Sequence, residues 1–149
     1  MTDTLWGLPD PDIHADFYAD VPFKRLIAWI VDTLVILLLT AVIVPFTAFT
    51  GLFFLPLLAA VVSFAYRTIT MTGKSATWGM RLVAIEFRTR TGQRFDLGTA
   101  VMHTFLYSVF FSFLIPQVAS IILILTGPRR QALHDLLLGT AAVNRAATT

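Results

Sequence analysis

The chain has 149 residues, of which 56% are hydrophobic and only 13% are charged, a composition outside the range of ordinary soluble domains. The 11 basic and 9 acidic residues leave a net charge of +2, too small an excess to indicate a nucleic-acid-binding protein. Because there is no cysteine, disulfides, a thiol nucleophile and cysteine-ligated zinc or iron–sulfur centres are excluded. The composition predicts a small integral membrane protein, with the lipid bilayer as its first partner.

Residues 1–22 are predicted to be a cytoplasmic acidic tail. Within it, Trp6–Asp12 should be extended or turn-like because Pro9 and Pro11 disfavour a helix, and we expect this segment to become ordered on contact. A cleaved signal peptide is not expected, since the first 23 residues carry aspartates and the apolar run that follows is too long and lacks a small-residue cleavage site. Residues 23–145 are the predicted membrane domain, and 146–149 a second tail.

The first apolar tract, Thr33–Tyr66, contains no charged residue and no histidine. A helix needs roughly 20 apolar residues to cross the hydrocarbon layer, so this tract and Leu26–Asp32 before it are long enough for two helices. We predict a two-helix hairpin with helices at about residues 26–44 and 48–66, and a break near Pro45–Gly51.

The distribution of basic residues predicts the orientation of this hairpin, because basic loops resist translocation. Lys24 and Arg25 precede the first helix, and Pro45–Gly51 between the helices has no charge. The stretch after the second helix is rich in basic residues: Arg67, Lys74, Arg81, Arg88, Arg90 and Arg94. The N-terminus and the middle loop are therefore predicted to be cytoplasmic, in a multi-pass membrane protein.

The middle loop has one segment typical of a strand, Leu82–Phe87, followed by the turn-prone pair Thr91-Gly92. Asp96 then stands where it can cap a helix that begins at Leu97. The sequence predicts a short cytoplasmic strand-like loop between membrane segments.

The second apolar tract, Leu97–Pro128, contains no Asp, Glu, Lys or Arg and a single histidine, His103, and we predict a long membrane segment at about residues 99–126, broken at Pro116. Two arrangements remain open. The limbs Thr99–Ile115 and Gln117–Thr126 can enter and return as a short hairpin that keeps all basic residues inside, provided that protein or water covers the re-entrant backbone. Alternatively, the segment is a third full span with an external C-terminus.

The last predicted element is a short amphipathic helix at about residues 129–138, opened by Gly127-Pro128 and ended by Gly139. Its length and composition indicate an interfacial position. The predicted fold class is thus an all-α integral membrane protein with two spans and a hairpin, or with three spans.

Asp32 is the acidic residue of the first helix and the first candidate site. It lies seven residues after Arg25, which places it about 10 Å further along the helix on nearly the same face. A carboxylate at that depth must face protein or water, pair with a cation or take up a proton. Two interpretations follow: a proton or cation site, or a structural anchor that holds the helix to a basic partner.

Asp135 is the second candidate, in the segment Arg129-Arg130-Gln-Ala-Leu-His134-Asp135. An ion pair with its neighbours on the surface would contribute little. The alternative is that Asp135 or the adjacent arginines reach the first helix and complete a buried network with Arg25 and Asp32.

Three blocks of sequence resemble the RDD family of prokaryotic membrane proteins. They are Lys24–Asp32, Thr77–Leu82 and Arg129–Thr140, in the family's order and covering about residues 22–145. The resemblance makes Arg25, Asp32 and Asp135 the signature positions and implies a place in a bacterial inner membrane. Our candidates for residues that support this cluster are Arg81, Arg129, Arg130 and His134. Met80 stands where the family often has lysine. Some members of the family resemble sodium/proton antiporters and others have been suggested as transport components.

Other motifs favour no catalytic or cofactor site. Thr72-Gly-Lys-Ser75 echoes a phosphate-binding loop, but the required earlier glycine is replaced by Thr68, so nucleotide binding is not expected. His14, His103 and His134 have no sequence-near partners at metal-ligand spacing, so we expect no metal and no cofactor. Nothing indicates a catalytic triad, and we expect the protein not to be an enzyme.

Two functions remain. One is a component of ion or solute transport, with proton/cation exchange at Asp32. A single chain of this size offers few polar groups to line a pathway, so this function requires a homo-oligomer or another membrane protein. The alternative is a non-transporting accessory or assembly protein whose Arg25, Asp32 and Asp135 cluster is structural.

Overall fold

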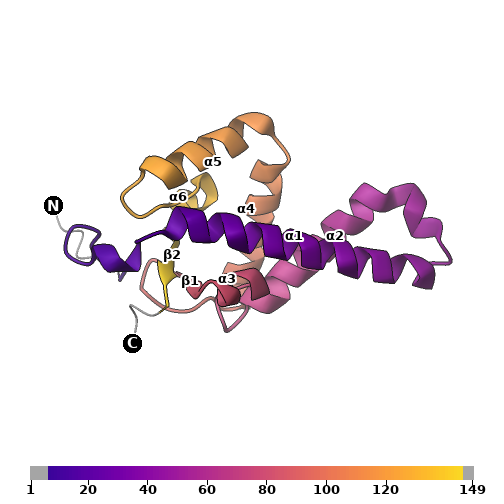
Figure 1. Ribbon diagram of the computed structural model, residues 1–149, viewed down its shortest axis with the longest axis horizontal. Helices are drawn as coiled ribbons and strands as arrows, with labels where there is room; N and C mark the ends of the chain where they lie inside the picture. Colours follow the sequence, from indigo (N-terminus) through magenta and orange to yellow (C-terminus); the bar gives the residue numbers. More distant parts are fainter. Residues whose placement is uncertain (1–6, 146–149) are drawn as a thin grey trace.

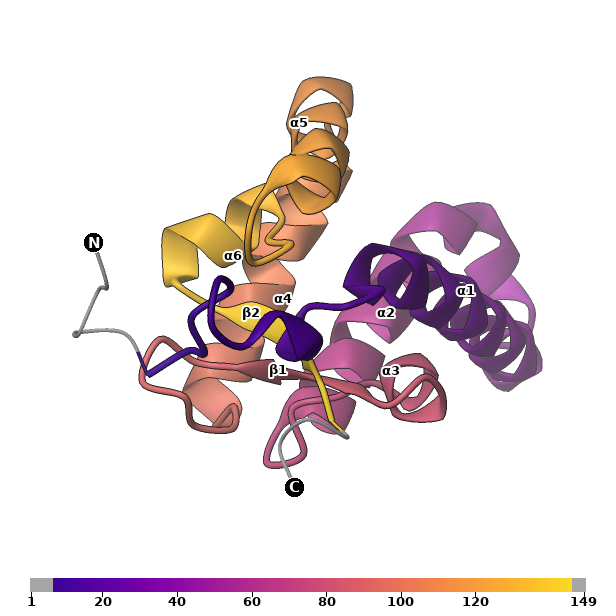
Figure 2. The ribbon, with the colours of Figure 1, turned by 60° about the vertical axis from the view of Figure 1, so that its left-hand side comes forward.

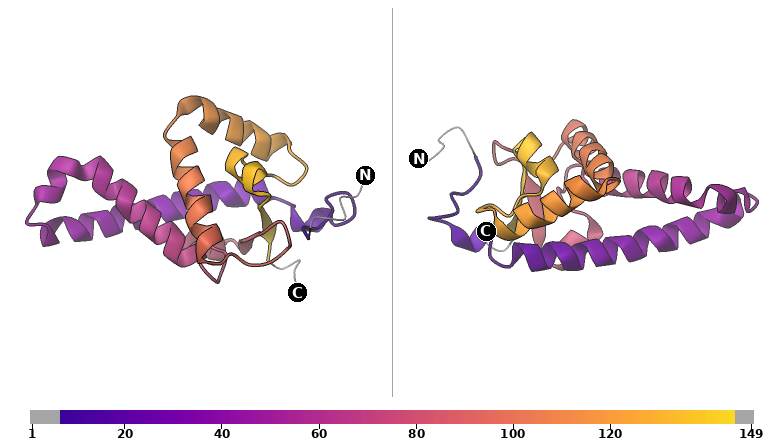
Figure 3. Two further views of the ribbon diagram at one scale, coloured as in Figure 1. Left: turned by 180° about the vertical axis from the view of Figure 1, so that it is seen from behind. Right: turned by 90° about the horizontal axis from the view of Figure 1, so that it is seen from above.

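A long helical hairpin projects from a smaller folded body in the computed structural model, which describes residues 7–145 (Figure 1). Helix α1 (Val21–Phe46) and helix α2 (Leu55–Met71) form the hairpin, joined by a turn and the 3-10 helix η2 (Thr50–Phe54). Seen from above, the two helices extend together beyond the other elements (Figure 3). Both, with the short 3-10 helices that precede them, are long and apolar enough to cross a membrane.

The predicted helices of this hairpin are present, but their bounds differ from the expected 26–44 and 48–66. Helix α1 begins earlier, with Pro22 in its first turn where a missing N–H is harmless, and includes Pro45 in its last turn. Helix α2 begins later because Pro56 again occupies a first turn, while Phe49 adopts a left-handed conformation (φ 65°) that interrupts the chain before it. The break is therefore longer than predicted.

The body contains four more α-helices and a sheet, with short helix α3 (Trp78–Leu82) leading into strand β1 (Ile85–Arg88). Strand β2 (Ala141–Asn144) pairs with β1 in antiparallel register, with Ile85 opposite Asn144 and Arg88 opposite Ala141. The strand character of the middle loop is confirmed, although β1 begins three residues later than the predicted segment. The expectation of an all-α fold is corrected by this sheet, because β2 forms only through its pairing with β1.

The second apolar tract forms two helices, α4 (Leu97–Phe111) and α5 (Leu114–Thr126), bent by 115° at the break between them. Asp96 caps α4 as predicted, accepting a hydrogen bond of 2.8 Å from the backbone N–H of Thr99. The break lies at Ser112 and Phe113 and not at Pro116, which is the third residue of α5. Proline is tolerated there because the first turn of a helix has no internal partner for that N–H.

Helix α6 (Leu133–Leu138) is shorter than the predicted 129–138. Arg130 has φ 52°, which ends any helical turn, and the Asp135 carboxylate instead accepts a hydrogen bond from the N–H of Ala132 at the helix start. The predicted stop at Gly139 is confirmed, because this residue is left-handed with φ 73°.

The core lies where α3, β1 and the start of α4 meet the start of α1 and the end of α2. Its buried residues include Val21, Met71, Met80, Ile85 and Phe95. A second cluster joins the N-terminal segment to β2: Leu8 and Tyr18 pack on Ala141 and Val143. Trp6 and the 146–149 tail lie outside the described residues.

Large apolar side chains remain exposed along the rest of the molecule. They lie along α1, η2, α2 and α5, including Leu34, Leu38, Phe53, Leu57 and Ile122. A water-soluble protein does not leave such continuous apolar surface uncovered. Two helices, or three if the bent α4–α5 pair is one span, are therefore candidate membrane spans.

Candidate functional site

Asp135 is the centre of a buried polar cluster. Its side chain has no exposed surface, and its Oδ2 accepts hydrogen bonds from the guanidinium of Arg25 at 2.9 Å and from the backbone of Ala132 at 3.1 Å. Its Oδ1 accepts from His103 Nε2 at 2.7 Å and from the Thr140 hydroxyl at 3.0 Å. Both oxygens are thus fully used by donors from four segments. The sequence prediction that Asp135 reaches the first helix agrees with this geometry.

The charge of Asp135 is stabilised by these neighbours. Burial alone would raise the pKa of the Asp135 carboxyl, but the positive charge of Arg25, together with the hydrogen bond from His103, holds it well below its usual range. Asp135 therefore stays ionised, and Arg25 is the counter-ion that makes its burial tolerable.

His103 joins this cluster from α4, and sequence reasoning missed it. Because the Asp135 carboxylate only accepts, His103 Nε2 carries the proton, and its Nδ1 is buried without a hydrogen-bond partner among the described residues. The ring also packs against Phe87 and Phe95, with centroid distances of 4.4 Å and 5.3 Å. The sequence signal for this residue was its position as the single histidine of the second apolar tract. The sequence could not identify its partner, which is 32 positions away.

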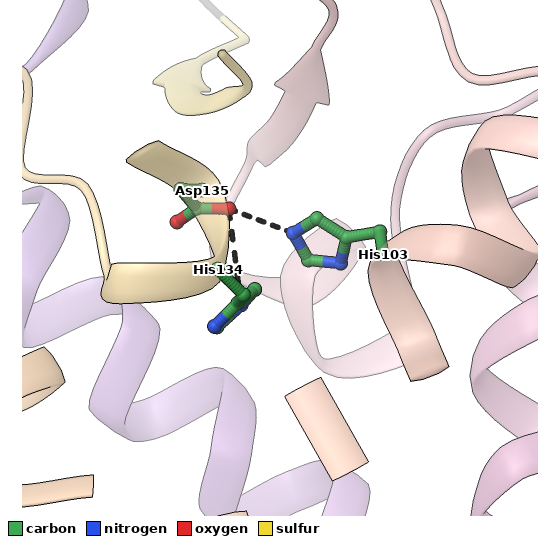
Figure 4. Close-up of side chains that lie close together, drawn as sticks. All are labelled: His103, His134 and Asp135. Carbon is green, nitrogen blue, oxygen red and sulfur yellow. Dashed lines mark hydrogen bonds and ion pairs between the residues drawn. The ribbon is translucent and has the colours of Figure 1, made fainter. Parts of the chain in front are cut away.

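His134 faces the same carboxylate oxygen as His103, as Figure 4 shows, with its Nε2 3.8 Å from Asp135 Oδ1. Burial lowers the pKa of His134 to about 3, and the nearby charges of His103, Arg25 and Arg67 add to the effect of burial while Asp135 opposes it. His134 is therefore neutral at physiological pH, and it packs edge-on against the rings of His103 and Tyr107.

The ligand atoms of His103, His134 and Asp135 all lie within 4.8 Å of one another, the grouping expected of a metal centre. The donor set does not fit one, however. Each Asp135 oxygen already accepts two hydrogen bonds, and the Arg25 guanidinium at 2.9 Å would repel a divalent cation. The arrangement is better suited to holding or moving a proton than to binding a metal.

Asp32 lies in a separate buried site and does not pair with Arg25. Its oxygens accept hydrogen bonds from the Tyr66 and Thr77 hydroxyls, both at 2.6 Å, and from the backbone N–H of Gly79 at 2.9 Å. These donors belong to α2 and to the start of α3, so Asp32 fastens three helices together. The proposed single network of Arg25, Asp32 and Asp135 is wrong: the two aspartates have different partners.

The close approach at this site depends on Gly79. A Cβ atom on this residue would lie 2.3 Å from the Ala28 carbonyl oxygen and 2.9 Å from Asp32 Oδ1. Only glycine permits α3 to come so near α1, and this proximity brings the Gly79 N–H to the carboxylate.

The four residues predicted to support the signature positions lie in different parts of the structure. His134 belongs to the Asp135 cluster, whereas Arg81 donates to the carbonyl oxygens of Ala76 and Thr70 and touches neither aspartate. Arg130 donates to the Leu125 carbonyl, and Arg129 lies beside the Tyr18 phenol. Those three arginines stabilise turns and the N-terminal segment.

A cavity of about 470 Å³ lies next to both aspartate sites. Its polar lining includes Arg25, Asp32, Arg67, His103 and Tyr107, and its apolar walls come largely from α1 and α5. Figure 2 shows α5 and α1 as diverging arms above the sheet. This volume is in the range of sites that hold a small organic ligand.

Comparison with protein-family models matches the chain to the RDD family over residues 20–139. No curated protein and no solved structure matches the chain. The matched region contains α1 to α6, both aspartate sites and the cavity between them.

Proposed function

The chain belongs to the RDD family, and from that premise we propose that it is a component of ion or solute transport whose binding site is the cavity beside Arg25, Asp135 and His103. The observation that supports this proposal best is that the cavity is lined by a histidine with a free nitrogen and by Arg25, whose charge partner Asp135 lies on a helix distant in sequence. Such groups are costly in a membrane protein and usually serve a pathway.

His103 is the group that we propose takes up the proton. Its Nε2–H is held by Asp135, so Nδ1 has an unused lone pair, and the charged or titratable groups around the ring are Asp135 and His134 of α6 and Arg25 of α1. Proton/cation exchange at Asp32 has less support, because three hydrogen bonds already occupy its carboxylate.

We further propose that both termini are cytoplasmic and that α4 and α5 form a returning hairpin in a bacterial inner membrane. Strand β2 near the C-terminus pairs with β1 in the middle loop, so the two must lie on the same side of the bilayer. The bend of 115° between α4 and α5 supports the same arrangement. A third full span would separate β1 from β2.

A single chain has two long spans, so the proposed pathway forms between copies or with another membrane protein. One observation favours the second candidate, an accessory or assembly protein: both aspartates are fully engaged by donors of this chain. In that case the polar clusters only hold the helices in register.

Proton flux into liposomes with an internal pH dye separates the two functions. After addition of sodium, potassium or lithium, the transport function predicts cation-dependent flux that His103→Gln abolishes. His14→Gln is the matched control, because His14 is exposed and distant in sequence from the cluster, and should leave the flux intact. If folded wild-type protein gives no flux with any of the three cations, this chain does not exchange protons for them by itself, and the accessory function is favoured.

A further inference from the structure

Arg67 is a cation of the cavity wall that no carboxylate neutralises directly. It lies one turn before the end of α2, and no Asp or Glu of residues 7–145 lies within 4 Å of its guanidinium. One nitrogen donates to the Tyr107 hydroxyl at 3.2 Å, while Nε is buried and has no acceptor in the described part of the chain. Arg25, the other arginine of the cavity, is by contrast paired with Asp135.

Tyr107 fixes the position of this arginine and adds a donor of its own. The guanidinium lies 4.2 Å from the centroid of the Tyr107 ring, and the hydroxyl oxygen accepts hydrogen bonds from both Arg67 and the Trp29 indole. Since the oxygen accepts twice, the phenolic proton is directed to another acceptor. Arg67 and Tyr107 together present several donors at the cavity, and no described residue accepts a hydrogen bond from Arg67 Nε.

Asp32 does not supply the missing acceptor, although it also lines the cavity. Its oxygens are occupied by Tyr66, Thr77 and Gly79. Unused donors beside a planar guanidinium are best satisfied by a carboxylate or phosphate, which can accept two hydrogen bonds at once. The polar end of the ligand is therefore an anion.

The rest of the cavity requires an apolar ligand body. Its walls are formed by aliphatic and thioether side chains: Leu26, Met71, Met80, Ile121, Ile124 and Leu125. An inorganic anion would leave these walls empty, whereas an alkyl chain would fill them and remove apolar surface from water.

We propose that the cavity binds an anionic amphiphile, with its headgroup on Arg67 and Tyr107 and its alkyl chain between α1 and α5. This inference rests on the proposed function, in that it names the class of solute held in the same cavity. Arg67 stands at the membrane end of the basic middle loop, which is the level at which a lipid or fatty-acid headgroup lies. The shared chemistry is one anionic oxygen group joined to a hydrocarbon chain.

Trp29 is a built-in reporter, because it lines the cavity and donates to Tyr107. With Trp6→Phe and Trp78→Phe as background, the protein is placed in phosphatidylcholine vesicles and titrated with dibromostearate, whose bromines quench indole fluorescence. We expect saturable quenching by dibromostearate and only weak, non-saturating quenching by dibromostearyl alcohol, which lacks the charge. Quenching by brominated phosphatidylglycerol is compared with quenching by brominated phosphatidylcholine, to test whether an anionic membrane lipid supplies the same headgroup chemistry.

Arg67→Gln should weaken the saturable binding on the order of tenfold, through loss of a charge-assisted pair. Tyr107→Phe removes one donor without changing charge and should weaken binding several-fold, which keeps the test valid if Arg67→Gln does not fold. Lys74→Gln is the matched control, because it removes an exposed cation of the adjoining loop and should have no effect.

Equal quenching by acid and alcohol, or binding unaffected by both cavity variants, would overturn the proposal. Inorganic phosphate that abolishes the quenching when added at the same concentration as the probe would also overturn it, because the alkyl chain of the ligand would then contribute nothing to binding. If the protein binds the probe saturably but shows no cation-dependent proton flux, this inference stands and the transport role falls. If it shows proton flux but no saturable binding of the probe, the transport role stands and this inference falls.

Discussion

The pairing of Arg25 with Asp135 can be tested by a double-mutant cycle. Asp135 is completely buried and the Arg25 side chain is 15% exposed, so removing either partner leaves a charge in a site with little water. The loss expected from breaking a buried pair is about 3–5 kcal/mol. Because Arg25 retains some contact with solvent, we expect Arg25→Met and Asp135→Asn each to lower the unfolding free energy by ~3 kcal/mol, near the bottom of that range.

The double variant removes both charges and should recover part of the loss. Directly bonded residues commonly show coupling of about 0.5–3 kcal/mol, and we expect ~2 kcal/mol here. The assay is SDS-induced unfolding in mixed micelles, followed by tryptophan fluorescence, for the wild type, the two single variants and the double variant.

A matched second cycle combines Arg25→Met with Asp32→Asn. Asp32 is bonded to Tyr66, Thr77 and Gly79, and not to Arg25, so these two losses should add within about 0.5 kcal/mol. Additive losses for Arg25 and Asp135, or strong coupling between Arg25 and Asp32, would refute the assignment of partners made from the structure.

Three further predictions concern topology, packing and pH. A cysteine at position 48 should react with an impermeant thiol reagent added outside, whereas cysteines at positions 74 and 145 should react only after permeabilisation; external labelling at 145 would contradict the returning hairpin. Gly79→Ala should destabilise the protein by ~3 kcal/mol through overpacking against Ala28, while Gly98→Ala, whose Cβ would meet only an atom 3.8 Å away, should be neutral or slightly stabilising in the same unfolding assay. Since burial lowers the pKa of His134 to about 3, the unfolded chain binds this proton at higher pH than the folded protein, and stability should fall as pH decreases from 6.5 towards 3, by at most about 1.4 kcal/mol per unit. His134→Gln should flatten that slope, and an unfolding midpoint equal at pH 7 and pH 5 in the wild type would contradict the shift.

The sequence by itself determined the features that depend on neighbouring residues or on composition. Long charge-free tracts can be stable only in an apolar environment, so the membrane character and the helical hairpin followed directly. The Asp96 cap and the Gly139 stop were also predictable, because each is decided by one side chain or one left-handed residue within a single turn. Helix bounds were less accurate, since four prolines occupy first or last turns where they do not end a helix.

Only the tertiary structure decided which polar groups meet. Arg25 and Asp32 share a face of α1, and helical spacing alone favoured a pair between them. Packing instead places Arg25 beside α6, 110 positions away, and places Asp32 against α2 and the start of α3. A buried carboxylate needs donors from whichever segments surround it, and their identity depends on how the helices pack and not on the residues adjacent in sequence.

The same reason explains His103 and strand β2. His103 is an isolated histidine in an apolar helix until α6 brings Asp135 to its ring. Residues 141–144 have no strong strand signal of their own, and they become a strand because β1 offers unpaired backbone groups at the matching position. Local chemistry therefore specified the helices, whereas long-range packing built the cavity, divided the two aspartates between separate sites and gave the histidine its partner.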